Sequence, residues 1–248
     1  MSVAGQELEL WKETNELIDY EEEEVRVAGQ KFLIQSLPEQ LPLEVLSKLV
    51  DANVEISGRC PWPGSLLLAT YLAKSSDRVL HVTGKRVIEL GAGSGILGLA
   101  LSKWCEHIVL TDADPFALNL INVNVEKNLS VESNTIVRKL RWGEAEDIEN
   151  CSISGSFDVV LAADVCYKLE IVAPLVQTCA QLAPVFVLCH VPRHGVTHDF
   201  VTKEASKAGY ELKECITVDE ALIAMAPDGV NEGVGCVDGK IFVFHRTQ

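Results

Sequence analysis

From residue 64 onwards, short apolar runs alternate with longer segments whose apolar residues recur every three or four positions. Short runs rich in Val, Ile and Leu are typical of buried strands, and the longer segments are typical of helices with one buried face. Strands are predicted over residues 86–90, 107–110, 135–140, 157–161, 185–188, 211–217 and 240–244. Helices are predicted over residues 64–74, 96–104, 115–127, 169–182 and 198–208.

This alternation of strands and helices predicts an α/β fold with a mostly parallel, doubly wound sheet. Such sheets bind ligands in the crevice beyond the carboxyl ends of their strands, near the point where the strand order reverses. We therefore expect the functional residues in the loops that follow the first four predicted strands.

The residues ahead of this core predict a small extension. Two β-rich runs flank a turn with a glycine over residues 24–35, which predicts a hairpin. Over residues 40–50, apolar side chains at three- and four-residue spacing (Leu43, Leu46 and Val50) predict a helix.

Length and composition indicate one globular unit. The chain has 248 residues, and α/β folds reach about 250 residues as one domain. No apolar run approaches the roughly 18 residues of a membrane span, and the N-terminus lacks the basic and apolar regions of a signal peptide. The eight cysteines include no C-x-x-C pair, so we expect no zinc site, and reduced thiols in the cytosol or nucleus.

Charge narrows the class of partner. The net charge is −15, which gives no reason to expect a surface that follows nucleic-acid phosphates, whereas a basic protein partner is easily accommodated. Residues 1–24 hold nine acidic residues and one basic residue. This composition predicts a solvated, partly disordered arm, while a short amphipathic helix stays open as an alternative because of Leu8, Leu10, Trp11, Leu17 and Ile18.

The strongest local signal is a glycine-rich run at the end of the first core strand, Glu-Leu-Gly-Ala-Gly-Ser-Gly-Ile-Leu-Gly over residues 89–98. Glycines at alternate positions allow a tight turn and the close approach of a ligand. Beginning at Gly93, the run fits the dinucleotide fingerprint G-x-G-x-x-G, which would make the chain a nicotinamide-dependent oxidoreductase.

Beginning at Gly91, the same run is G-x-G-x-G with Glu89 two residues earlier. This arrangement resembles motif I of the seven-strand S-adenosylmethionine-dependent methyltransferases, whose loop wraps the amino-acid part of the cofactor. It fits better, because a carboxylate at Glu89 would repel a diphosphate but can reach toward an ammonium group. Asp112 follows the next strand, where a carboxylate can accept hydrogen bonds from ribose hydroxyls, and Asp114 is either an alternative or a helix cap.

Three further motifs make the resemblance more specific. They are Pro-Trp-Pro at 61–63, Trp-Gly at 142–143 and the D-x-x-Y pattern from Asp164 to Tyr167. In this order and spacing they resemble the protein-lysine methyltransferases of methyltransferase family 16, the methyltransferase-like 21 group. The resemblance covers roughly residues 58–170 and becomes weak beyond residue 190.

The family implies a Rossmann-like methyltransferase fold, a seven-strand mostly parallel sheet with an antiparallel last strand. We expect an acidic arm over residues 1–24 and a single methyltransferase domain over 25–248, divided into an N-terminal extension (25–60) and a catalytic core (61–248). The cofactor implied is S-adenosyl-L-methionine, with no metal.

The family also implies a role for particular positions of this chain. Cofactor contacts are implied for Trp62 over the entrance, Gly91, Ala92 and Gly93 along the methionine moiety, Asp112 on the ribose, and Trp142 and Ala163 beside the adenine. Asp164 and Tyr167 are implied to face the methyl-accepting nitrogen.

The activity implied is methyl transfer to a lysine side chain of a protein substrate, with a basic acceptor segment. A lysine amine has a reference pKa of about 10.4 and must lose a proton before it attacks. A carboxylate at Asp164 would attract the ammonium but also favour its charged form, so the sulfonium charge and desolvation would have to lower the pKa. A small-amine, histidine or arginine N-methyltransferase, or a non-catalytic interaction module on the same fold, stays open.

Overall fold

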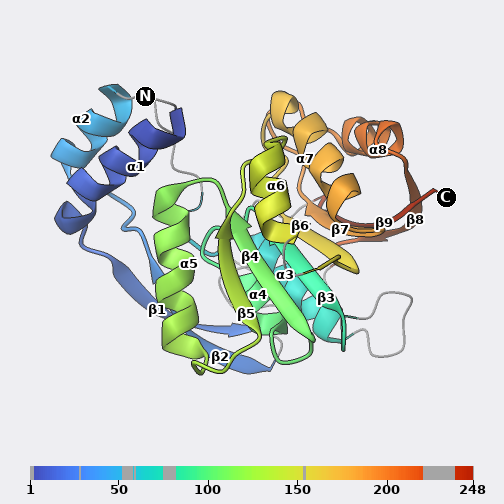
Figure 1. Cartoon of the computed structure of the whole chain (residues 1–248), viewed down its shortest axis with the longest axis horizontal. Coiled ribbons are helices and arrows are strands. Elements are labelled where there is room, and N and C mark those ends of the chain that lie inside the picture. The colour runs from blue at the N-terminus through green and yellow to red at the C-terminus, as the bar shows by residue number, and fades with distance from the viewer. Residues whose placement is uncertain are drawn as a thin grey trace.

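The computed structural model describes residues 3–27, 29–51, 58, 60–74, 82–152, 155–219 and 238–247. A central sheet has the strand order β5-β4-β3-β6-β7-β9-β8 (Figure 1). Its strands are β3 (Arg86–Leu90), β4 (His107–Asp112), β5 (Thr135–Lys139), β6 (Val159–Ala163), β7 (Val185–His190), β8 (Tyr210–Thr217) and β9 (Lys240–Arg246). Only β9 runs antiparallel to its neighbours β7 and β8. The predicted seven-strand sheet with an antiparallel last strand is confirmed.

Helices cover both faces of this sheet. One face packs against α3 (Pro63–Ala73), α4 (Ile96–Leu101) and α5 (Pro115–Asn128), and the other against α6 (Ala145–Ser152), α7 (Leu169–Leu182) and α8 (His198–Lys207). Burial on both faces explains why the inner strands β3, β6 and β7 are largely continuous apolar runs, whereas the edge strands β5 and β8 are more exposed. Within the described ranges, no helix is long and apolar enough to cross a membrane.

One helix was absent from the sequence prediction. The segment that forms α6 is mostly polar, and only Ile148 and Cys151 are buried, so its hydrophobic pattern is too short to stand out. The α4 helix ends at Leu101, earlier than the predicted residue 104, and a short turn leads from it into β4.

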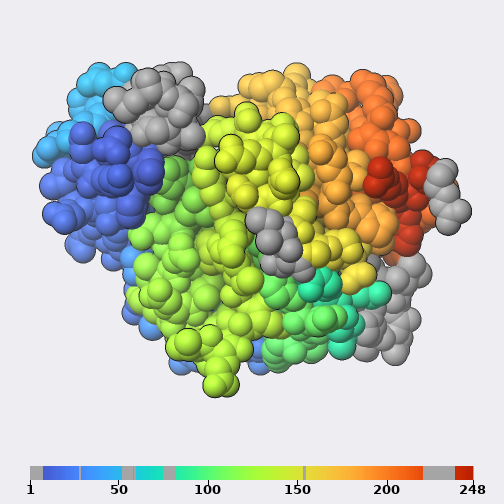
Figure 2. Space-filling view, viewed as in Figure 1, coloured from blue at the N-terminus to red at the C-terminus, as the bar shows by residue number. Residues whose placement is uncertain are grey.

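The N-terminal segment is ordered structure, which contradicts the prediction of a solvated arm and agrees with the alternative of a short helix. Residues 3–17 form α1 (Val3–Thr14) and a 3-10 turn (Asn15–Leu17), and β1 (Glu21–Val27) pairs antiparallel with β2 (Gln30–Ser36) in the expected hairpin. Leu10 and Ile18 are buried in a small core that also holds Phe116 and Leu120 of α5. This N-terminal lobe, blue in Figure 2, lies beside α5.

The helix predicted over residues 40–50 exists as α2 (Leu43–Asp51), but its buried face is not the one that the spacing suggested. Val45 and Leu49 are buried in the N-terminal core, whereas Leu43 is 85% and Val50 75% exposed. Apolar residues occur on both faces of this helix, so periodicity predicted the helix and the neighbouring elements determined its orientation.

Asn124 on α5 connects the hairpin to the glycine-rich loop of the sheet. Its fully buried side chain accepts a hydrogen bond from the Gln35 backbone N–H (2.7 Å) and donates to the carbonyl oxygens of Gln35 (3.1 Å) and Ser94 (2.9 Å). The side chain therefore satisfies backbone groups of both segments at once.

We expect Asn124→Ala to lower the free energy of unfolding by about 3 kcal/mol, because it leaves buried backbone groups without partners. Urea unfolding monitored by circular dichroism measures this loss. Asn122→Ala is the matched control on the same helix, since that exposed side chain makes one hydrogen bond, to the Leu118 carbonyl oxygen, and should cost less than about 1 kcal/mol. Equal losses in the two variants would contradict the assignment.

Candidate functional site

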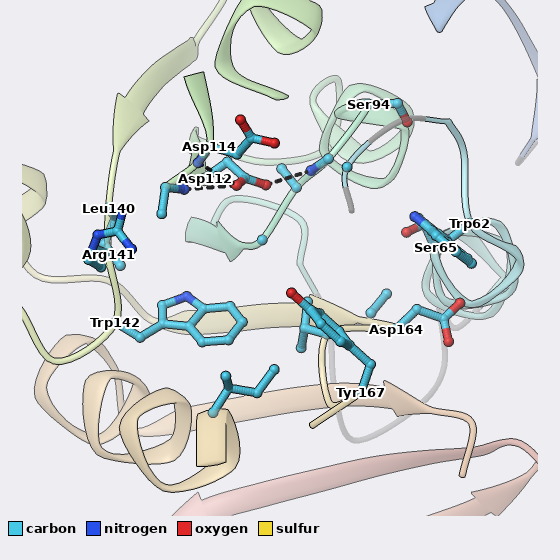
Figure 3. A pocket seen from close by; sticks show the side chains of 18 of the residues that line it. Trp62, Ser65, Ser94, Asp112, Asp114, Leu140, Arg141, Trp142, Asp164 and Tyr167 are labelled. Carbon is cyan, nitrogen blue, oxygen red and sulfur yellow. Dashed lines mark hydrogen bonds between the residues drawn. The ribbon is translucent and has the colours of Figure 1, made fainter. Parts of the chain in front are cut away.

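A cavity of about 670 Å³ opens at the carboxyl ends of β3, β4, β5 and β6 (Figure 3). Its position is the one expected for a ligand site in a doubly wound sheet. All nine residues singled out from the sequence line it: Trp62, Gly91, Ala92, Gly93, Asp112, Trp142, Ala163, Asp164 and Tyr167. Positions far apart along the chain thus meet at one cavity.

The loop after β3 needs glycine for two reasons. Gly91 and Gly93 have φ angles of +67° and +57°, in the left-handed region that favours glycine. A Cβ atom on Gly91 would also lie 2.7 Å from Cγ1 of Val165 and 3.2 Å from Cζ2 of Trp142. The loop therefore presents bare backbone to the cavity.

The last glycine of the run has a packing role. A Cβ atom on Gly98 would lie 1.9 Å from Cδ2 of Leu110, so this position lets α4 lie close to β4. The third glycine of the dinucleotide fingerprint has the same packing role, so Gly98 does not distinguish the two interpretations of the run.

Asp112 ties the ends of two strands together. Its carboxylate accepts hydrogen bonds from the backbone N–H groups of Gly93 (3.1 Å), Ala113 (2.8 Å) and Asp114 (3.1 Å). Burial raises its pKa, and these hydrogen bonds oppose the rise. Asp114 accepts from the Phe116 N–H at 2.9 Å and is the N-cap of α5, so the two aspartates have separate structural roles.

Glu89 does not line the cavity. Its side chain is buried, and Oε2 accepts a hydrogen bond from the Gly98 N–H (2.9 Å) at the inner side of the loop. Burial raises the pKa of this carboxyl to about 8, against the hydrogen bond from Gly98 and with a contribution from the Asp112 charge. In this structure Glu89 supports the loop from behind instead of reaching toward a ligand.

The raised pKa gives Glu89 a testable effect on stability. Between pH 4.5, the ordinary value, and pH 8, the folded protein holds a proton that the unfolded chain has released, so the unfolding free energy falls as the pH rises through this window. In the wild type, the free energy of unfolding should fall between pH 5 and pH 8. We expect this fall to be smaller by about 2–4 kcal/mol in Glu89→Gln. Urea unfolding at the two pH values measures it.

Glu126→Gln is the control for this measurement, because Glu126 is an exposed glutamate on α5. It should leave the pH dependence of the wild-type protein unchanged. A Glu89→Gln variant with the same pH dependence as wild type would show that Glu89 is already ionised at neutral pH.

Trp142 and Tyr167 extend into the cavity from the loops that follow β5 and β6. Figure 3 shows the indole of Trp142 and the hydroxyl of Tyr167 both pointing toward the middle of the cavity. Gly143, at φ +86°, turns the chain after Trp142, and its N–H donates to Oγ1 of Thr178 on α7 (2.9 Å). The backbone next to Trp142 is thereby tied to α7.

Asp164 lies at the cavity wall, but its carboxylate is turned away from the cavity centre toward α3 (Figure 3). Oδ2 accepts from the Gly64 N–H (2.7 Å), and Oδ1 pairs with Nη2 of Arg193 (2.8 Å). The side chain is 1% exposed and the residue has φ +57°. Burial raises its pKa, and the Arg193 charge and the Gly64 hydrogen bond oppose that rise.

Arg193 is the residue at this wall that the sequence analysis missed. It lies in the loop between β7 and α8, with its guanidinium carbon 5.4 Å from the centre of the Trp62 ring. Its position just after a parallel strand, beside the carboxyl ends of the others, was the signal that could have found it. Among the described residues, no cluster of three or more His, Cys, Asp or Glu side chains could hold a metal ion.

Comparison with known proteins agrees with these features. The family described as lysine methyltransferase matches residues 44–207. EEF1A lysine methyltransferase 3 of Xenopus tropicalis is 34% identical over 144 residues, which are 56% of this chain and 61% of that protein. Protein N-lysine methyltransferase METTL21A of Xenopus tropicalis is 30% identical over 181 residues, 68% of this chain and 80% of that protein. A calmodulin-lysine N-methyltransferase of Arabidopsis thaliana is 31% identical over 52% of this chain and 42% of its own length.

Solved structures share the fold at low sequence identity. Magnesium protoporphyrin IX methyltransferase from Synechocystis PCC 6803, with bound SAH, superposes with a TM-score of 0.54 at 12% identity, over 85% of this chain and 90% of that one. The ribosomal protein L11 methylase from Lactobacillus delbrueckii subsp. bulgaricus gives 0.51 at 12% identity, over 75% and 79%. These similarities concern the fold alone.

Proposed function

This chain belongs to the lysine methyltransferase family, and from that premise we propose that it transfers a methyl group from S-adenosyl-L-methionine to a lysine side chain of a protein substrate. One observation carries the proposal beyond family membership. The nine residues that the family implies for cofactor and acceptor lie around a single cavity at the ligand-binding edge of the sheet.

The cavity suits the cofactor in size and in chemistry. Its volume of about 670 Å³ lies within the roughly 300–1,000 Å³ that is usual for small-molecule sites. Bare backbone at Gly91 and Gly93 would follow the methionine part, the Asp112 carboxylate would accept from ribose hydroxyls, and Trp142 and Ala163 would border the adenine. When bound, S-adenosylmethionine would supply an electrophilic methyl group for in-line displacement.

The residues of the chain contribute alignment and electrostatics to this reaction. Tyr167 directs its hydroxyl into the cavity, where it can donate a hydrogen bond or lie against the stem of the acceptor. We call the part of the cavity lined by Asp164, Tyr167 and Arg193 the acceptor end. Trp62, at the start of α3 and 37% exposed, would close the entrance above the cofactor.

The protein substrate is proposed to offer a basic acceptor segment, in the cytosol or nucleus. Relatives are named for lysine methylation of EEF1A and of calmodulin, which supports a protein as acceptor. The net charge of −15 would attract a positively charged segment and speed its encounter with the enzyme. Glu21 and Glu23 on β1 are exposed, whereas Glu22 pairs with Lys127 and Glu24 with Arg26 and Lys31.

The test is incubation of the purified protein with labelled S-adenosylmethionine and an extract of cells that lack this protein, followed by mass spectrometry of the labelled residue. Methylated lysine is the expected product. Label on histidine, arginine or a small amine would favour those N-methyltransferases, and no label would favour an interaction module. A thermal shift with NAD but none with S-adenosylmethionine would support the oxidoreductase instead.

A further inference from the structure

The acceptor end contains an ion pair that connects three segments of the chain. Asp164, at the end of β6, pairs with Arg193 of the β7–α8 loop at 2.8 Å and accepts from the N–H of Gly64, in the first turn of α3, at 2.7 Å. The guanidinium of Arg193 also lies 5.4 Å from the ring centre of Trp62, within the range of a cation–π contact. One cation thus holds both an acid of the D-x-x-Y motif and the tryptophan at the entrance.

The Asp164–Arg193 ion pair is largely shielded from water. The Asp164 side chain is 1% exposed and that of Arg193 is 27% exposed, so the carboxylate has almost no access to water. Both carboxylate oxygens already have partners, Gly64 on one and Arg193 on the other. Removing one member of a buried ion pair leaves an uncompensated charge that strongly destabilises the folded protein. Arg193 and Asp164 therefore depend on each other.

The ion pair also affects whether an acceptor amine is protonated. A lone carboxylate beside a lysine favours the ammonium form, which cannot attack a methyl group. Asp164 and Arg193 together carry no net charge, so the pair exerts no net attraction on the proton of the acceptor ammonium. This resolves the difficulty that Asp164 alone would hold the acceptor in its unreactive state.

We propose that Arg193 is a positioning residue for methyl transfer: its guanidinium neutralises Asp164 and fixes Trp62, so that the acceptor end receives an uncharged amine instead of trapping an ammonium ion. This inference rests on the proposed lysine methyltransferase function. Arg193 acts through Asp164 and Trp62 and need not touch the reacting atoms.

Other ionisable groups near the site are common to the variants compared below. Asp164 faces Arg193 from the β7–α8 loop and Cys166 from its own loop, while α3 offers it a backbone N–H. The other ionisable groups that line the cavity include Asp112, Asp114, Arg141, Tyr167, Glu170 and His194. A difference between Arg193→Gln and Arg193→Lys therefore reports the charge at residue 193.

The experiment measures the initial rate of labelled methyl incorporation into the extract described above, from pH 7 to pH 10, at saturating S-adenosylmethionine. In Arg193→Gln the uncompensated Asp164 should stabilise the acceptor ammonium and move the pH midpoint of the rate upward by about one unit or more. The rate should fall about tenfold or more at pH 7 and recover as the pH rises. Arg193→Lys keeps the charge and should keep the midpoint.

Two further variants of the chain serve as controls for this experiment. The double variant Asp164→Asn/Arg193→Gln removes both charges together, so its midpoint should return to that of the wild type, and it serves if Arg193→Gln does not fold. Arg26→Gln is the matched control, because Arg26 is 77% exposed in an ion pair on β1. S-adenosylhomocysteine binding by calorimetry checks that each variant keeps its cofactor site.

A loss of rate in Arg193→Gln that no pH restores, or a rate and midpoint equal to wild type, would overturn the inference while leaving the proposed function intact. A double variant whose midpoint lies a pH unit from wild type would overturn it as well. A wild-type protein that transfers no methyl group would overturn the proposed function and this inference together.

Discussion

Gly93→Arg is expected to abolish cofactor binding, with the affinity for S-adenosylhomocysteine lowered by about 10³-fold or more, equivalent to about 4 kcal/mol. Gly93 lines the cavity at φ +57°, where a residue with a side chain is strained. A Cβ atom there would already lie 3.4 Å from Cα of Gly58, and the rest of an arginine would have to occupy the space proposed for the methionine part. Isothermal titration calorimetry measures the loss.

Gly84→Arg is the matched control for this substitution. Gly84 has a similar φ of +68° and lies in the turn before β3, where an added Cβ atom would meet no other atom within 4 Å. It should bind S-adenosylhomocysteine as the wild type does, even if the strain lowers its melting temperature. Binding by Gly93→Arg within tenfold of wild type would mean that the glycine-rich loop is not the cofactor site.

Asp164→Ala is expected to reduce methyl transfer by about 10²-fold or more while the affinity for S-adenosylhomocysteine stays within about tenfold of wild type. The substitution removes the partner of Arg193 and the acceptor for the Gly64 N–H, so an unpaired cation is left at the acceptor end. The glycine-rich loop and Asp112 have no contact with the Asp164 carboxylate among the hydrogen bonds described. Rates of methyl incorporation and calorimetric binding separate the two effects.

Asp158→Ala controls for the loss of a partly buried aspartate from the same part of the chain. Asp158 immediately precedes β6 at the opposite end from Asp164, and its carboxylate accepts from the Arg86 N–H at 2.8 Å. It should lower stability without a selective loss of transfer. If Asp164→Ala lost cofactor affinity in parallel with activity, Asp164 would belong to the cofactor pocket and not to the acceptor end.

The sequence alone determined most of the secondary structure and which residues meet at the cavity. The apolar runs predicted the inner strands such as β3, β6 and β7, because a strand buried on both faces needs a continuous apolar segment, while the edge strands β5 and β8 are more exposed and carry charged residues. Gly91 and Gly93 predicted a loop whose backbone a ligand can approach closely, and their positive φ angles are ones that most other residues avoid. The D-x-x-Y motif directed attention to Asp164 and Tyr167, and both reach the same cavity.

The tertiary structure decided the direction of individual side chains. Glu89 turns to the Gly98 N–H and Asp164 to Arg193, so two carboxylates that the sequence suggested for a ligand are held by the protein itself. Likewise, α2 buries Val45 instead of Leu43 because the N-terminal core lies on that side. A one-dimensional pattern records which residues are apolar or charged, but the partner that satisfies a buried charge comes from a distant segment, and only folding brings the two together.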